Sequence, residues 1–564
     1  MHFFAPRRFF ALNHHWRWAL GWSIAIVLLS CLPYLMATQM APPGWQFAGI
    51  LVNPYDGQSY LAKMRQGFDG QWLFHLTYTP EPHEGAFIFT FYLALGHLAR
   101  LTGLPLIIVF HLARLIAGFI LLLVSFRFIN FVLADPHERR LAFILLATSS
   151  GLGWLGAIFG AFPIDLWVPE AFVPYSLFAN PHFPLAMALM LLILQQATEK
   201  ITEERGEKGE RREEQQGEGG KEKGEVFFPL PSLFPLLSSV LLALILPFAM
   251  LTVWAVLAVY LGWQFYIATR HNPNSFHLSF LPLSSLPSLL SPLLSLPVIV
   301  YDYWVSATNP VLAAWSTQNV TLAPSALNFG LGYGLVGLLA VAGGWVIIRQ
   351  RVKNKGEWLV LLWAITTLLL VYFPFFDLQR RLINGLHIPL CILAAVGLNR
   401  WLASNALRYN YRRMFTNIVV TIGALGTLFV WTIPLLGFLH PPTEGQTSAL
   451  FFVRGSESVA FNWLRENSTS NSVILASPRL GMFVPGQTGG RAFYGHPFET
   501  IDAKSKKEMV EAFYRGELDT VAPLPDWIIY GPSEKALGQP KNLDEYPIVF
   551  STQDITVYKV NKDR

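Results

Sequence analysis

Charged residues are scarce in this chain of 564 amino acids. Asp, Glu, Lys and Arg make up 14% of the chain, apolar residues make up 53%, and the mean hydropathy is +0.40. Soluble domains carry about 25% charged residues. The shortage excludes a cytosolic enzyme or a secreted domain and predicts an integral membrane protein. The formal net charge of +5 indicates no nucleic-acid partner, because the basic residues lie in loops between apolar runs.

Cysteines and nucleotide-binding motifs are also lacking. The two cysteines, Cys31 and Cys391, both lie inside apolar segments, which argues against a disulfide framework or a Cys-based metal site. The chain contains no GxxxxGKS/T motif and no GxGxxG after a strand, so nothing indicates a bound nucleotide.

Long apolar runs are what the chain has in abundance. A membrane-spanning helix needs about 20 apolar residues, and runs of roughly that size predict about eleven transmembrane helices. They lie near residues 18–37, 105–126, 141–160, 183–198, 230–247, 249–268, 281–300, 327–348, 357–373, 383–402 and 414–437.

The basic residues of the loops predict the orientation, because short cytoplasmic loops are enriched in Lys and Arg. With the amino terminus in the cytoplasm, the inner loops hold 22 basic residues and the outer loops 5. The carboxyl terminus then lies outside, in the periplasm if the host is bacterial. Counting 84–102 as another crossing would spoil this asymmetry, so we expect that segment to form a helix in the outer interface.

Three segments lie outside these runs. The first outer loop, 38–104, is aromatic and rich in Pro and Gly. Residues 199–225 are almost entirely polar and charged, which predicts a disordered cytoplasmic linker. Residues 440–564 combine a helical stretch with short β-like runs and predict a small extracytoplasmic α/β domain after the membrane domain 1–439.

The first outer loop carries Asp56 in the stretch NPYDGQSYLAKMRQG. A helix over 55–67 would hold this carboxylate at the outer interface, where it could accept a proton from an attacking hydroxyl as a general base. Asp is also a favoured helix cap, so a purely structural role stays open.

Adjacent arginines, Arg380 and Arg381, lie at the outer end of a predicted span. Arginine donates paired hydrogen bonds to phosphate, which suits a lipid phosphate or diphosphate at the membrane surface. The alternative is that both side chains reach ordinary lipid headgroups. His387, two turns further along, either packs between helices or joins the same phosphate pocket.

The second outer loop contains Asp165, Glu170 and His182 but no base. Acids without bases could bind a divalent cation or orient sugar hydroxyls, although their spacing matches no metal motif. Arg114, inside the second span, faces either a structural partner or a cavity. Tyr60 is either part of the interfacial aromatic belt or part of a platform for a sugar.

Together these features resemble the GT-C superfamily of membrane glycosyltransferases, which includes the protein O-mannosyltransferases and the aminoarabinose transferase of lipid A. The resemblance is carried by the acidic first-loop motif around Asp56, by AFIFTFYLALGHLARLTGLPLIIVFHLARL, by QRRLINGLHIPL and by NWLRENSTSNSVILASPRLGMFVP. The chain differs from the mannosyltransferases at Gly57, where those enzymes often have a second acid.

The resemblance implies an inverting transfer of a sugar from a polyprenyl-phosphate donor at the outer face of the membrane. It implies Asp56 as general base and Arg380 and Arg381 as the clamp on the donor phosphate. The sequence leaves open whether the acceptor is a protein, a lipid or a glycan, and favours a bacterial inner membrane. The alternative functions are a transporter or flippase of lipid-linked sugars and a non-catalytic assembly factor.

Overall fold

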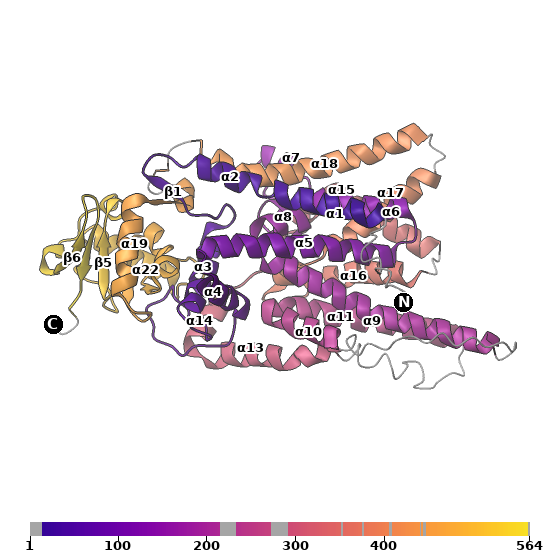
Figure 1. Cartoon of the computed structure of the whole chain (residues 1–564), viewed down its shortest axis with the longest axis horizontal. Helices are drawn as coiled ribbons and strands as arrows, with labels where there is room; N and C mark the ends of the chain where they lie inside the picture. The colour runs from indigo at the N-terminus through magenta and orange to yellow at the C-terminus, as the bar shows by residue number, and fades with distance from the viewer. Residues whose placement is uncertain are drawn as a thin grey trace, which may run out of the picture.

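The computed structural model describes residues 14–214, 233–271, 291–350, 354–374, 377–404, 409–439, 442–443 and 447–561. Most of the chain forms helices that run along the long axis of the molecule, and an α/β segment closes one end (Figure 1). The helices before that segment are α1 His14–Leu29, α2 Leu32–Gln39, α3 Pro54–Phe68, α4 Thr90–Thr102, α5 Leu106–Val132, α6 Pro136–Thr148, α7 Gly153–Ile158, α8 Val173–Ala179, α9 His182–Glu214, α10 Leu233–Ile245, α11 Pro247–His271, α13 Leu296–Thr308, α14 Pro310–Gln318, α15 Ala326–Arg349, α16 Lys355–Val371, α17 His387–Ser404 and α18 Tyr409–Leu436.

Helices form most of the described part of every apolar run that predicted a span. By length and composition, six helical segments can cross a membrane, and their bounds are His14–Gln39, Leu106–Val132, Pro136–Ile158, Pro247–Arg270, Ala326–Arg349 and Asn410–Leu436. The run at 281–300 lies partly outside the described residues. A multi-pass helical membrane protein is therefore confirmed, whereas the number of eleven crossings stays a prediction.

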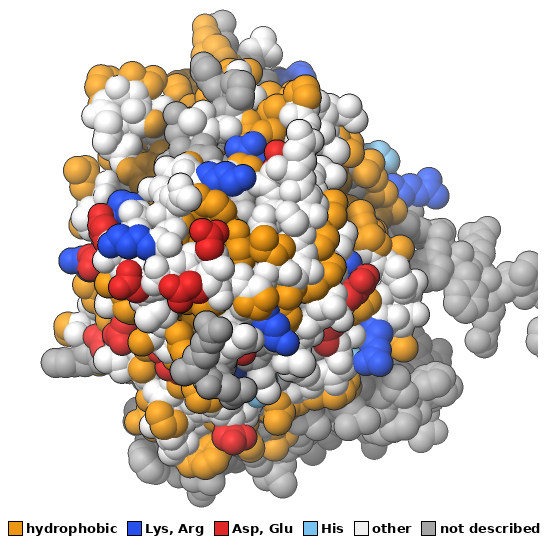
Figure 2. All heavy atoms as spheres, turned by 90° about the vertical axis from the view of Figure 1, so that its left-hand side faces the viewer, with side chains coloured by type: hydrophobic (Ala, Val, Ile, Leu, Met, Phe, Trp, Pro, Cys, Tyr) orange, Lys and Arg blue, Asp and Glu red, His pale blue; other side chains and the backbone are white. Residues whose placement is uncertain are grey.

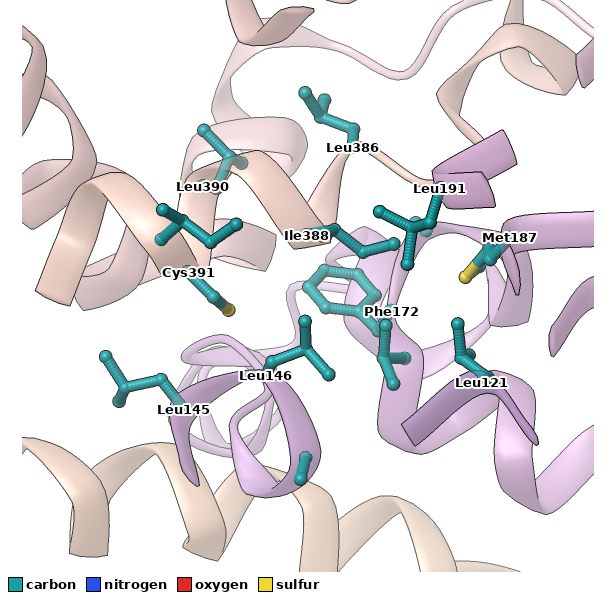
Figure 3. Packing of buried hydrophobic residues seen from close by; sticks show 14 of the residues in the cluster. Leu121, Leu145, Leu146, Phe172, Met187, Leu191, Leu386, Ile388, Leu390 and Cys391 are labelled. Carbon is teal, nitrogen blue, oxygen red and sulfur yellow. The ribbon is translucent and has the colours of Figure 1, made fainter. Parts of the chain in front are cut away.

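Apolar side chains from distant parts of the chain meet in the centre of the helical bundle. The ring of Phe172, which precedes α8, lies among Leu146 of α6, Ile388 of α17 and the α9 side chains Met187 and Leu191 (Figure 3). Both cysteines are unpaired thiols, and that of Cys391 is buried in this core. Close packing of this kind fixes the helices, and hence the loops at their ends, in one arrangement.

Helix α9 continues into the segment 199–225, and the disordered cytoplasmic linker stays a prediction. Helix α9 begins in the core and continues to Glu214. Glu, Lys, Arg and Gln are good helix formers, and a helix already nucleated by a buried stretch needs no new nucleus to extend. Residues 215–225 lie outside the described residues.

The C-terminal segment 447–561 forms a five-stranded sheet with the order β4-β3-β5-β7-β6. Strands β3, β4 and β5 are parallel, and β7 is antiparallel to β5 and β6. Their bounds, with those of the segment's helices, are β3 Val473–Leu475, β4 Arg491–Ala492, β5 Trp527–Tyr530, β6 Ile548–Ser551, β7 Thr556–Lys559, α19 Gly455–Asn467, α20 Pro478–Gly481, α21 Val484–Thr488, α22 Ala503–Tyr514 and α23 Pro532–Lys535. Four of these strands and α19 lie where the apolar pattern predicts them.

Alternate residues of the central strands face opposite sides of this sheet. Ile474 and Ile529 belong to the cluster that contains Phe461 of α19, whereas Leu475 belongs to the cluster that contains Phe513 of α22. The outer surface of this end carries acidic and basic side chains interspersed with apolar ones (Figure 2).

The first loop holds the C-terminal segment against the helical bundle. Strand β1, Trp45–Phe47, pairs antiparallel with β2, Phe452–Arg454, and the hydroxyl of Tyr78 donates to the carbonyl of Met482 (2.8 Å). Helices α3 and α4 lie beside this segment at the same end of the molecule (Figure 1). The first outer loop and the C-terminal segment thus pack together around α3.

Helices α3 and α4 cross with their backbones in close approach. A Cβ added at Gly67 would lie 2.0 Å from the carbonyl oxygen of Leu93, and one added at Gly96 would lie 1.9 Å from that of Met64. Only glycine fits at both positions. Helix α4 lies within the segment 84–102 that was expected to form an interfacial helix, and it packs directly against α3.

Candidate functional site

Asp56 lies in the first turn of α3, with its side chain about half exposed (48%). The helix begins at Pro54 and its N-cap is Asn53, in the left-handed conformation (φ 45°). Asp56 is therefore not the cap, and that structural alternative is wrong. A carboxylate in the first helical turn is stabilised by the helix dipole, and its exposure leaves it accessible to a substrate.

Arg380 and Arg381 lie in the 3-10 helix η6, Gln379–Ile383. The backbone N–H of Arg380 donates to the carbonyl of Thr321 (3.0 Å), which anchors this loop. The Arg380 guanidinium lies over the ring of Trp167, 4.8 Å from its centre, and its Nε is buried without a hydrogen-bond partner among the described residues. Neither guanidinium forms an ion pair within the described part of the chain.

Electrostatic effects link these arginines to Asp56 and to Glu170. Burial lowers the pKa of Arg380, while Glu170 and Asp56 raise it and Arg381 lowers it further. Glu170 lies in the 3-10 helix η2, Pro169–Ala171, and is buried (5% exposed). We call Asp56, Glu170, Arg380 and Arg381 the acid–arginine cluster. It combines three separate outer loops of the predicted topology.

Tyr60, one turn after Asp56, lies at the same cluster. Burial raises its pKa well above the usual value, Asp56, Glu170 and Glu499 raise it further, and Arg381 opposes them. Its ring stacks on that of Tyr92 at 4.4 Å, nearly parallel (8°). The Tyr92 hydroxyl forms a 2.6 Å hydrogen bond with Nδ1 of His182. Tyr60 and His182 therefore contribute an aromatic wall beside the charges.

The sequence interpretation missed a buried ion pair next to this wall. Lys63 of α3 lies 2.9 Å from Glu499 of the C-terminal segment, and the hydroxyl of Ser59 donates to the same carboxylate (2.6 Å). Burial alone would raise the pKa of Glu499, but Lys63, His496 and the Ser59 hydrogen bond outweigh it and lower that pKa. This pair connects α3 to the turn formed by residues 494–500.

His496 in the 494–500 turn was also missed. Its Nε2 lies 3.8 Å from Oδ1 of Asp56, although the ring itself is buried (1% exposed). Burial lowers the pKa of His496, whereas Glu499 and Asp56 act in the opposite direction. The sequence signal is the stretch GHPFET, in which the histidine lies between a glycine and a proline. The C-terminal segment thus contributes side chains to the surroundings of Asp56.

Arg114 does not join the cluster. Its guanidinium donates to the carbonyl of Leu177 (2.8 Å) and to the hydroxyl of Ser30 (3.2 Å), and it lies over the ring of Tyr34, 4.6 Å from the ring centre. These contacts connect α5 to α8 and to the first helices. These contacts favour the structural alternative for Arg114, and a contact with substrate or a cation stays a prediction.

Asp165 also lies outside the cluster. Its Oδ2 accepts from the backbone N–H of Gly153 (2.9 Å) and from the hydroxyl of Ser150 (3.4 Å). Burial raises its pKa to about 6. This carboxylate holds the loop before α7 against η1, Ile164–Leu166, while its Oδ1 is buried without a hydrogen-bond partner among the described residues. Its contact with a substrate or a cation stays a prediction.

His387 packs between helices rather than beside the arginines. Its Nε2 lies 3.3 Å from Sγ of Cys391, and its Nδ1 accepts from the backbone N–H of Val173 (3.4 Å). The ring is buried beside Phe172. These contacts favour the helix-packing alternative, and a role of His387 in donor-phosphate binding stays a prediction.

No group of three or more His, Cys, Asp or Glu side chains among the described residues could hold a metal ion. The predicted divalent cation therefore has no preformed set of three ligands in this part of the chain. The acid–arginine cluster offers instead one exposed carboxylate, one buried carboxylate and two guanidiniums, which suits an anionic ligand and a proton-donating one.

Known proteins resemble this chain in structure. No family model matches it, and no curated protein matches its sequence. The oligosaccharyltransferase of Archaeoglobus fulgidus, solved with a tethered acceptor peptide, is 12% identical, with a TM-score of 0.51 over 91% of this chain and 69% of that one. ArnT of Cupriavidus metallidurans, bound to undecaprenyl phosphate, is 14% identical over 96% and 98% of the two chains, with a TM-score of 0.48.

A third similar structure is the mycobacterial arabinofuranosyltransferase AftD, which is 13% identical over 97% of this chain and 40% of that one, with a TM-score of 0.48. The likeness to the oligosaccharyltransferase shows that the chain has the fold of a GT-C membrane glycosyltransferase. The resemblance inferred from the sequence is thereby confirmed at the level of the fold.

Proposed function

We propose that this protein transfers a sugar from a polyprenyl-phosphate donor to an acceptor at the outer face of the membrane. The observation that supports the proposal is the acid–arginine cluster, in which the half-exposed Asp56 carboxylate acts electrostatically on Arg380, and neither Arg380 nor Arg381 has an ion-pair partner among the described residues. Unpaired guanidiniums are costly unless a ligand completes them. A phosphate ester supplies the matching charge and geometry.

The cluster can perform an inverting substitution. The acceptor hydroxyl attacks the anomeric carbon of the donor sugar as the bond from that carbon to the phosphate oxygen breaks, and the phosphate leaves with the bonding electrons. Asp56 takes the proton of the attacking hydroxyl. Arg380 and Arg381 hold the phosphate and stabilise the negative charge that it gains.

The environment of the cluster supports a lipid-linked donor. The arginines follow α16 and precede α17, and both helices are strongly apolar, so a phosphate bound there would lie near the ends of hydrophobic helices with its polyprenyl chain beside them. In the proposed topology the amino terminus is cytoplasmic and the C-terminal segment periplasmic, in a bacterial inner membrane with eleven crossings. The proposed donor supplies an activated sugar, so no nucleotide site is needed.

The proposal is tested with purified protein and labelled polyprenyl-phosphate sugars, by measuring the free polyprenyl phosphate that is released. A general base contributes about 10²–10⁴-fold in rate. Asp56→Asn is expected to reduce turnover at least 100-fold while donor binding persists. Asp69→Asn is the matched control, because Asp69 ends the same helix and its side chain is similarly exposed (40%).

A transporter or a flippase would move the lipid-linked sugar without releasing polyprenyl phosphate, and an assembly factor would do neither. Full turnover in Asp56→Asn would remove the base from the proposed mechanism. Absence of release by the wild-type protein with every donor would refute the glycosyltransferase itself.

A further inference from the structure

We infer that His496 is a positioning residue for Asp56, to which it donates a hydrogen bond from Nε2 when substrate occupies the site. The inference rests on the proposed function of Asp56. It assigns to the C-terminal segment a direct part in orienting the catalytic carboxylate, although that segment lies 440 residues further along the chain.

The 494–500 turn fixes the orientation of the His496 ring. Nδ1 accepts two backbone N–H groups, from Phe498 (3.1 Å) and Glu499 (3.0 Å). The backbone of His496 is held as well, because its carbonyl accepts from the N–H of Thr500 (3.0 Å). With Nδ1 serving as acceptor, the neutral ring carries its proton on Nε2.

That Nε2–H is the unsatisfied donor of the ring. Among the described residues Nε2 has no hydrogen-bond partner, although the side chain is almost completely buried. A buried donor without a partner is costly. Oδ1 of Asp56, 3.8 Å away, is the acceptor within reach, and hydrogen bonds in active sites are often long until substrate binds.

The other groups that face His496 do not compete for this donor. Glu499 is already engaged by Lys63 and Ser59. Tyr55 and Tyr78 approach the ring with their aromatic rings, at centre distances of 5.7 and 5.3 Å. Asp56 is thus the charged neighbour whose carboxylate has room for a further bond.

The consequence concerns the orientation of Asp56. A half-exposed carboxylate in a first helical turn can rotate freely. A general base in the wrong orientation slows the reaction even when the affinity for the donor is unchanged. A hydrogen bond to one oxygen holds the group and directs the other oxygen toward the acceptor hydroxyl. Loss of His496 should therefore lower the catalytic rate and leave donor affinity nearly unchanged.

Two substitutions separate positioning from packing. His496→Asn places a carbonyl oxygen near the position of Nδ1, so the turn keeps its acceptor but loses the donor to Asp56. His496→Gln places an amide N–H₂ near the position of Nε2 and restores that donor. We expect His496→Asn to lower kcat about 10- to 100-fold, with the donor KM within about threefold, because a charged hydrogen bond is lost. His496→Gln should recover most of kcat.

A double variant tests whether His496 acts through Asp56. In the Asp56→Asn background, His496→Asn should cause little further loss, because residues that act as a unit are not additive. Multiplicative losses, or an unchanged kcat in His496→Asn alone, would overturn the inference while leaving Asp56 as the base.

A titration tests the contact without any turnover. The pKa of His496 is measured by NMR on ¹³C-labelled histidine in lipid nanodiscs, with His496→Asn identifying its signal. Asp56→Asn should lower this pKa by at least about 0.5 of a pH unit, since Asp56 raises it, whereas Asp69→Asn should not change it. An unchanged value in Asp56→Asn would overturn the inference even if the protein transfers a sugar, and the predicted shift would support the contact between His496 and Asp56 even if no donor is found.

Discussion

Breaking the buried pair between Lys63 and Glu499 should release the 494–500 turn from α3. The two side chains are 2% and 12% exposed, so removing one partner leaves the other charge in a poorly solvated place. Such single substitutions typically cost about 3–5 kcal/mol. At about 1.4 kcal/mol per factor of ten, local opening of the turn should increase roughly 140- to 3,700-fold.

The two single variants should differ in size. In Glu499→Gln, the Lys63 ammonium keeps the face of the Phe89 ring, 4.6 Å from the ring centre, and cation–π attraction compensates part of the loss. In Lys63→Met, the Glu499 carboxylate keeps the hydrogen bond from the Ser59 hydroxyl and the electrostatic effect of His496. We therefore expect Lys63→Met to open the turn more than Glu499→Gln does.

Hydrogen exchange of the peptide that covers the 494–500 turn, followed by mass spectrometry in nanodiscs, measures this opening. The double variant Lys63→Met/Glu499→Gln should exchange more slowly than either single variant, because no uncompensated charge remains. The control is Lys507→Met/Glu511→Gln, an exposed pair on α22, which should change exchange less than about fivefold. Double-variant effects equal to the sum of the single effects would refute the pairing.

Three further predictions follow from the site and the loops. Arg380→Lys or Arg381→Lys should lower donor-dependent kcat/KM about ten- to a hundredfold, whereas Arg515→Lys on the outer surface should not. Unchanged kinetics would favour the alternative that both arginines contact ordinary lipid headgroups. A reporter inserted in 199–225 should be cytoplasmic and one at the carboxyl terminus external, and reporters on the same side would disprove the topology. The pKa of Glu499 is lowered in the folded chain, so its contribution to stability is complete above about pH 4.5 and is lost as the pH falls through the folded pKa. Hydrogen exchange of the 494–500 turn should therefore accelerate in acid, and Glu499→Gln should reduce that acceleration.

Local patterns predict the parts of this protein that local chemistry determines. Apolar runs predict the helices, and alternating apolar residues predict four strands of the C-terminal sheet. Charge in an outer loop next to an apolar run singles out Asp56, Glu170, Arg380 and Arg381, because such groups need a ligand or a partner in any fold. In the structure Arg380 is influenced electrostatically by the other three side chains.

The sequence does not predict the role of a residue whose contacts come from distant parts of the chain. Arg114, Asp165 and His387 have the same composition signals as the cluster residues, but backbone groups of neighbouring elements satisfy them. Lys63 reads as an ordinary loop base, and His496 and Glu499 read as polar residues of a distant segment. Their contacts with α3 depend on how the last segment docks, and no local period encodes that docking.

The docking of the last segment onto α3 has a consequence for biosynthesis. Lys63 and its partner are 436 residues apart, so at about 5–20 residues per second a ribosome needs roughly 20–90 s to make the second after the first. During that interval the nascent protein exposes Lys63, whose carboxylate partner is not yet made, together with the unpaired strand β1. A chain truncated before Glu499 would leave Lys63 without its carboxylate, and one truncated before β2 would also leave β1 without its pairing strand.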